Sequence, residues 1–157
     1  MAKKNRRRMK KKEALAYLEE FLNKYSQDER ILRMKDSPHH PNISAYTHTF
    51  RVVRKCVGIV KFFHMKVEWD NLLLGALLHD FYLYDFHEHS SFKNCFLHPK
   101  MAMKNAKELF DANDHVIKII KTHMFPLPIW KIPTSREAWV VSLADKLVSI
   151  KEAFTRK

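Results

Sequence analysis

The stretch that decides the fold is Leu72-Leu73-Leu74-Gly75-Ala76-Leu77-Leu78-His79-Asp80, an apolar run that ends in two polar side chains. Residues three, four and seven apart share a helix face, so Leu72 and Ala76 lead to His79, while Leu73 and Leu77 lead to Asp80. The run therefore predicts a helix that carries an imidazole and a carboxylate into a core. Burying both groups is costly unless something pairs with them, and a divalent metal ion would do so.

The same anomaly recurs on three other predicted helices. At helical spacing, His48 precedes Val52, Cys56, Ile59 and Phe63, His123 follows Val116, Ile119 and Ile120, and Asp145 lies among Ala138, Val141 and Val148. For any one of these residues, a hydrogen-bonded core histidine or an ion-paired aspartate is the commoner explanation. A metal centre explains all four anomalies with a single cause. Imidazole and carboxylate together favour Fe or Mn, with Zn, Co or Ni as alternatives, over Mg or Ca.

The order of these residues resembles the HD-domain superfamily of metal-dependent phosphohydrolases. The similar segments are 47–52 around His48, 77–80 around the His79-Asp80 doublet and 143–147 around Asp145. His98, followed by proline, and His123 resemble the two extra histidines of the dinuclear branch of that superfamily. The resemblance covers about residues 40 to 155 and implies an all-α fold, a single-domain helical bundle.

The resemblance also implies a ligand set and a reaction. One ion would be held by His48, His79, Asp80 and Asp145, and Asp80 would bridge to a second ion held by His98 and His123. Two ions about 3.5–4 Å apart can share a hydroxide and clamp phosphoryl oxygens. The expected reaction is hydrolysis of a phosphate ester or anhydride, in particular of a nucleotide, by a metal-activated hydroxide. If only one ion binds, the two extra histidines become phosphate contacts or general acids.

Three residues are catalytic candidates. Asp80 would orient the shared hydroxide as well as hold charge. Lys146 follows Asp145 and Arg51 lies three residues after His48, so either could approach a phosphate. The alternative for Lys146 and Arg51 is an exposed surface charge.

Four further residues are candidates for binding the substrate. Lys100 lies just inside a helix predicted to begin near Pro99, where anions are favoured. Tyr84, Asp85 and His87 lie in a long predicted loop, residues 81–97, that would overhang the metal ions. An ordinary packed loop is the alternative for these three residues.

Length and composition agree with a helical domain. The chain has 157 residues, only two glycines and six prolines, so signals for hairpins and tight turns are scarce. Besides the loop at 81–97, a shorter loop is expected at 126–133, and His39 and His40 fall in a loop before His48. His115 shares a face with Lys118 and Thr122 and is expected to be exposed. Helices are predicted near residues 11–25, 28–35, 44–65, 69–80, 99–110, 112–124 and 134–154.

The basic charge is concentrated at one end. Residues 1–12 contribute +8 to the formal net charge of +12, which predicts a disordered tail before an HD-type domain at 13–157. A solvated tail is favoured over docking on nucleic acid or another anionic surface. No run reaches the roughly 18 apolar residues of a membrane span. The two cysteines form no disulfide framework, so a cytoplasmic location is expected.

Three classes of function fit these observations. The leading one is an enzyme, a phosphatase or phosphodiesterase acting on a small phosphorylated substrate. The set of four histidines and two aspartates also resembles the diiron oxygenases on the same scaffold, such as myo-inositol oxygenase. A non-catalytic module that only binds metal or nucleotide is the third, and the intact ligand pattern disfavours it. The oligomeric state is left open.

Overall fold

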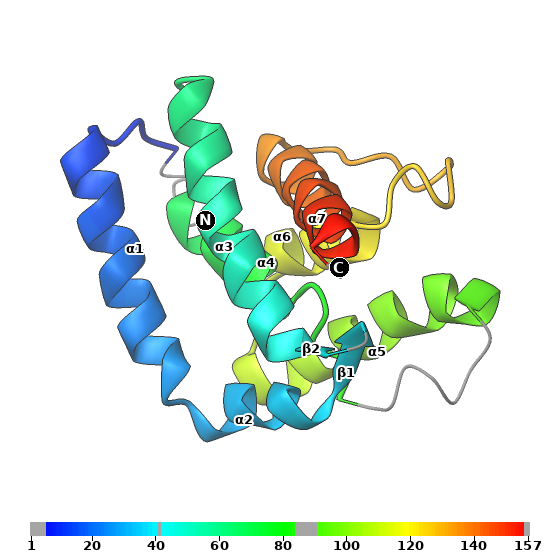
Figure 1. Ribbon diagram of the computed structural model, residues 1–157. Helices are drawn as coiled ribbons and strands as arrows, with labels where there is room; N and C mark the ends of the chain where they lie inside the picture. The colour runs from blue at the N-terminus through cyan, green and yellow to red at the C-terminus, as the bar shows by residue number, and fades with distance from the viewer. Residues whose placement is uncertain (1–5, 41, 84–90, 156–157) are drawn as a thin grey trace.

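The computed structural model describes residues 6–40, 42–83 and 91–155, without the side chains of His40 and residues 91–95, and the protein is all-α as predicted (Figure 1). The described elements are the α-helices α1 (Lys11–Ser26), α2 (Glu29–Leu32), α3 (Ala45–Phe62), α4 (Trp69–Leu78), α5 (Ser91–Phe110), α6 (Asp114–Thr122) and α7 (Arg136–Phe154), the 3₁₀ helix η1 (Arg33–Asp36) and the strands β1 (Pro38–His40) and β2 (Ile43–Ser44). The strands form one short antiparallel pair ahead of α3. Of the helices described, none is both long enough and apolar enough to cross a membrane.

Helix α4 lies at the centre of the bundle. It contacts α3, α6 and α7, while α1 packs on the outer side of α3 (Figure 1). Leu72, Leu73 and Leu77 are fully buried, which follows from a helix that is apolar on nearly every face. The apolar run therefore places its terminal His79 and Asp80 inside the core.

Gly75 explains how closely α6 approaches α4. A Cβ at this position would lie 2.8 Å from Cγ2 of Ile119, closer than side chains can pack. The missing side chain lets the two helices come together, and their ends carry His79 and His123. The sequence thus fixes the spacing of two site residues through one glycine.

Side-chain caps set the starts of three helices that carry site residues. Ser44 accepts a hydrogen bond from the Thr47 N–H at α3, and Ser135 accepts one from Ala138 at α7. Asn113 caps α6 in the same way. Each cap satisfies a backbone donor that the first turn leaves free, worth about 1 kcal/mol. These helices begin within two residues of the predicted positions.

Helix α5 differs from the prediction. It begins at Ser91 rather than near Pro99, so the predicted loop at 81–97 is shorter and Lys100 lies inside a helix instead of near its start. Proline is commonest in the first turn because it has no N–H to donate, and that preference placed the predicted start too late. The expected helix-terminus effect on an anion at Lys100 is therefore wrong.

The basic tail also differs from the prediction, from residue 6 onward. The backbone of Arg7 pairs with that of Val67 in both directions, with N···O distances of 3.0 and 3.3 Å. Met9 is 1% exposed, and Lys61 donates to its carbonyl oxygen. A high density of charge does not reveal one buried methionine between lysines and arginines, so this segment was misassigned as disordered. Residues 1–5 lie outside the described residues.

Candidate metal centre

The structure brings together all six residues predicted as metal ligands. They come from five helices or helix ends and are between 0% and 6% exposed: His48 on α3, His79 and Asp80 at the end of α4, His98 on α5, His123 at the end of α6 and Asp145 on α7. Side chains this polar are seldom buried together without partners. Their geometry divides them into two groups that meet at Asp80.

The first group surrounds one carboxylate oxygen of Asp145. Its Oδ1 lies 3.1 Å from Nε2 of His48 and 3.8 Å from Nε2 of His79. Oδ2 of Asp80 lies on the same side, 3.5 Å from Nε2 of His79. The facing atoms of His48, His79 and Asp145 are all within 4.8 Å of one another, a separation that suits ligands of one ion.

The second group surrounds the other oxygen of Asp80. The Nε2 atoms of His98 and His123 are 3.0 Å apart, and each lies 3.5 Å from Oδ1 of Asp80. One oxygen of Asp80 therefore faces each group. This is the arrangement that a carboxylate needs in order to bridge two ions.

Backbone hydrogen bonds set the orientation of two of the imidazoles. Nδ1 of His79 donates to the carbonyl oxygen of Ala76, and Nδ1 of His123 donates to that of Ile120, both at 2.7 Å. In the neutral ring the remaining nitrogen, Nε2, then carries a lone pair. Nε2 of His79 is buried and has no hydrogen-bond partner among the described residues. Because such an atom is costly to bury alone, the donor set fits a bound divalent cation.

Both aspartates are held in the charged form. Burial by itself raises the pKa of Asp80, but the surrounding imidazoles, His79 first and then His123, outweigh it and keep the pKa well below the usual value. Burial opposes ionisation of Asp145 in the same way. A hydrogen bond from His48 and the nearby His79 and Lys146 outweigh it there and hold the pKa of Asp145 well below its usual value. Two ionised carboxylates among imidazoles can bind a metal without first losing protons.

Glu152 is a site residue that the sequence analysis missed. Its Oε2 accepts a hydrogen bond from Nδ1 of His48 at 2.9 Å, and its Oε1 accepts one from Arg51 at 2.8 Å. Burial raises the pKa of Glu152, but these two hydrogen bonds lower it to about 2. A carboxylate behind a ligating histidine fixes the ring and raises its basicity. The available signal was the seven-residue spacing from Asp145, which places Glu152 on the same face of α7.

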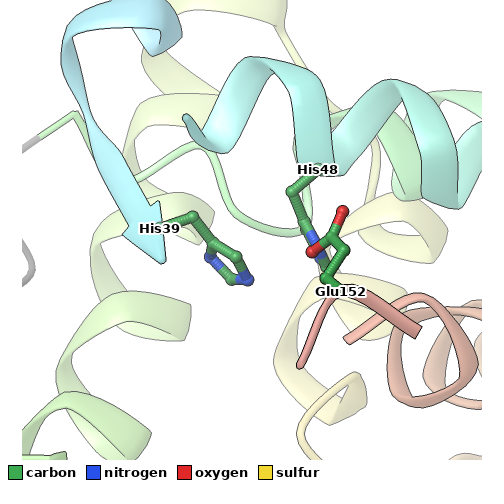
Figure 2. A group of neighbouring side chains, drawn as sticks. All are labelled: His39, His48 and Glu152. Atoms are coloured by element: carbon green, nitrogen blue, oxygen red, sulfur yellow. The ribbon is translucent and has the colours of Figure 1, made fainter. Parts of the chain in front are cut away.

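His39 is the second site residue that was missed, because it was assigned to a loop. Figure 2 shows His39 on β1 beside His48 and Glu152, which come from α3 and α7. The rings of His39 and His48 stack with their centroids 3.9 Å apart. Nδ1 of His39 lies 3.3 Å from Oδ2 of Asp80. The two-stranded pair that positions His39 has no recognisable pattern in so short a segment.

The candidates for phosphate contact are placed as follows. Lys146 donates to Oδ2 of Asp145 at 2.7 Å and to the carbonyl oxygen of His123 at 2.8 Å, so it lies between the two groups of ligands. The guanidinium of Arg51 faces Glu152, behind His48, and a phosphate contact by Arg51 stays a prediction. Lys100 is exposed on α5. Tyr84, Asp85 and His87 lie outside the described residues.

Lys100 belongs to a group of lysines around Lys131. Lys100 lies two residues after His98, and Lys121 lies two residues before His123. Burial lowers the pKa of Lys131, and so do the positive charges of Lys121 and Lys100, so both lie near enough to Lys131 to repel its ammonium group. Such a group of like charges favours an anion.

His115 is partly buried, so the prediction that it is exposed is wrong. Its ring lies between two carboxylates, with Nδ1 3.1 Å from Glu68 and Nε2 3.2 Å from Glu137. Arg6 also reaches this cluster, 3.4 Å from Glu68. The apparent polar face of α6 is covered by the start of α4 and of α7, a contact that helical periodicity does not reveal.

Comparison with known protein families agrees with this geometry. The model of the HD domain matches residues 45–150, which include all six predicted ligands, and the chain belongs to the HD-domain family. No curated protein and no solved structure matches the chain.

Proposed function

We propose that the protein is a metal-dependent phosphohydrolase that cleaves a small phosphate ester or anhydride, in particular that of a nucleotide. The observation that carries the proposal is the position of Asp80, whose two oxygens face two separate groups of ligands. The residues present would hold two divalent ions, Fe or Mn being favoured by the donor set. When bound, such ions supply water of lowered pKa at neutral pH and positive charge for phosphoryl oxygens.

The protein side chains have separate tasks in this proposal. Asp80 and Asp145 stay ionised and hold the centre together, and Glu152 keeps His48 oriented. Lys146 is fixed by Asp145 and by the His123 carbonyl, so it can present positive charge at the centre with little loss of conformational freedom. These groups require a substrate that is anionic where it meets the metals.

The lysines beside His98 and His123 support a substrate with more than one phosphate. Lys100, Lys121 and Lys131 form a second positive region, on the helices that carry these histidines and on the segment after α6. Trp130, next to Lys131 in the chain, is 72% exposed and stacks with Phe96, so these aromatic rings are candidates for stacking on a base. A nucleotide combines these two features, a chain of phosphates and an aromatic base.

The test is a comparison of two Asp→Asn variants. Nucleoside monophosphates, dinucleoside polyphosphates and cyclic dinucleotides are screened for hydrolysis with Mn or Fe under reducing conditions. Asp80→Asn keeps the shape but removes the charge, so turnover should fall by several orders of magnitude while the fold is retained. Asp114→Asn, at an exposed residue in the first turn of α6, should behave like the parent.

Two outcomes of this screen would contradict the proposed hydrolysis. If no phosphorylated compound is hydrolysed while the ferrous protein consumes oxygen with a polyol or a phosphonate, the protein is a diiron oxygenase and the proposal is wrong. If neither reaction occurs but metal and nucleotide bind, it is a binding module.

A further inference from the structure

A groove with basic side chains in its lining lies on the surface between α3 and α7. Its volume is about 580 Å³, within the roughly 300–1,000 Å³ typical of small-molecule sites. The groove lies next to Glu152, on the side of His48 that bears Nδ1 rather than the metal-facing Nε2. The residues that line it are Arg51, Arg54, Lys55, Gly58, Val148, Lys151, Glu152 and Thr155.

The lining is strongly basic where it meets solvent. Arg54, Lys55 and Lys151 are exposed, and no carboxylate of the described residues pairs with any of them. Glu152 is the one acidic residue of the lining, but it is buried and its charge is already offset by Arg51 and His48. The three positive charges repel one another, and a bound anion would relieve this repulsion.

Gly58 gives an independent indication that the groove is kept open. Glycine in the middle of a helix costs about 1 kcal/mol relative to alanine. At Gly75 close packing explains the glycine, whereas a Cβ at Gly58 would meet nothing within 4 Å. Gly58 lies in helix α3, so no unusual backbone conformation requires it either. The missing side chain leaves room above the floor of the groove.

We propose that this groove binds a chain of two or more linked phosphates, separately from the metal centre. The α3 residues of the lining run from 51 to 58, about 10 Å along the helix at 1.5 Å per residue. This length exceeds a single phosphate and suits a linear di- or triphosphate, with Lys151 of α7 on the opposite wall. Guanidinium and ammonium groups are the usual partners of phosphate oxygens.

The groove is joined to the metal centre by two hydrogen bonds. A phosphate chain in the groove would contact Arg51. Arg51 donates a hydrogen bond to Glu152, and Glu152 accepts a second one from Nδ1 of His48. Occupation of the groove can therefore change how firmly the His48 ring is held. The binding itself does not depend on the proposed hydrolysis.

The test is calorimetric titration of the full-length protein with inorganic tripolyphosphate. Gly58→Glu fills the groove with a longer side chain of opposite charge, and Gly58→Ala is its matched control because it adds one methyl group. We expect Gly58→Ala to bind slightly more weakly than the parent, because its methyl group takes up part of the room that glycine leaves, and Gly58→Glu and Lys55→Glu to bind about tenfold more weakly or worse. Lys107→Glu makes the same charge change on exposed α5 and should bind like the parent.

Three results would overturn the proposal. The first is equal binding by Gly58→Glu and the parent, which would put the probe at the metal centre. The second is a loss of affinity in Lys107→Glu as large as that in Lys55→Glu, which would reduce the effect to net charge. The third is that the parent does not bind the probe at millimolar concentration. A thermal unfolding curve for each variant confirms that it is folded. Gly58→Ala should unfold at a slightly higher temperature than the parent, because its helix propensity is better.

Discussion

Replacing Glu152 by glutamine should weaken metal binding although Glu152 is not one of the six predicted ligands. The carboxylate accepts a hydrogen bond from Nδ1 of His48 and thereby favours positive charge at Nε2, whether that charge is a proton or a metal ion. With both carboxylates in place, burial lowers the pKa of His48 but hydrogen bonds to Asp145 and Glu152 raise it to about 10. A divalent ion carries twice the charge of a proton. Loss of the Glu152 carboxylate should therefore weaken the binding of a metal ion at Nε2 of His48 more than it weakens the binding of a proton there.

The expected loss of affinity is about 10- to 100-fold, the usual effect of removing such a partner, or about 1.4–2.8 kcal/mol. Glutamine keeps an acceptor for His48, so Glu152→Gln should lie near the lower figure and Glu152→Ala near the upper one. The assay is a Mn²⁺ or Zn²⁺ titration in competition with a chromophoric chelator at constant pH.

The matched control is Glu108→Gln on the exposed surface of α5. Glu108 lies 4.0 Å from Lys104, and such exposed pairs contribute little, so this variant should bind metal like the parent. Should Glu152→Gln bind metal within twofold of the parent, Glu152 does not support His48 and the reasoning about the ligand geometry is refuted.

Three further predictions concern the second ion, the amino-terminal segment and acid stability. His98→Ala should lower the metal content from two ions per chain to one, and a parent that never exceeds one ion under iron- or manganese-replete conditions would exclude the second site. Deleting residues 1–12 should lower the free energy of unfolding by about 3 kcal/mol, since Met9 is buried and Arg7 pairs with Val67, while deleting residues 1–5 alone should leave these contacts intact. The folded-state pKa of Glu152 is about 2, below its ordinary value of 4.5, so its contribution to the stability of the metal-free protein should be present above about pH 4.5 and lost as the pH falls through 2. A pH series of urea unfolding, with Glu152→Gln showing a smaller loss in this window, measures that contribution.

The sequence alone predicted the helices that carry the centre. The apolar spacing around His48, His79-Asp80, His123 and Asp145 is a local pattern, and a 3.6-residue period reports a buried face without knowledge of its neighbours. The order of these residues then identified the HD-domain family, which the family model confirms. The all-α class was implied by that resemblance, and the helical periodicity and the scarcity of turn residues agree with it.

Three features of the structure differ from the sequence predictions, because the residue pattern there is not periodic or fits two structures. The start of α5 was placed at Pro99 because proline resembles a helix start, and Met9 was overlooked among basic residues. His115 lay on a face that seemed polar, but Glu68 and Glu137 cover it. In each case the deciding contact joins residues far apart in the chain.

Only the tertiary structure decided how the buried faces meet. It placed one oxygen of Asp80 toward each group of ligands, brought Glu152 behind His48, and used a two-residue strand pairing to bring His39 against both. It also left a basic groove beside Glu152 that no local pattern indicates. Periodicity encodes which side of a helix is buried, whereas the distance between two side chains depends on how whole helices pack. A single glycine, Gly75, lets α6 approach α4 and so affects the distance between His79 and His123.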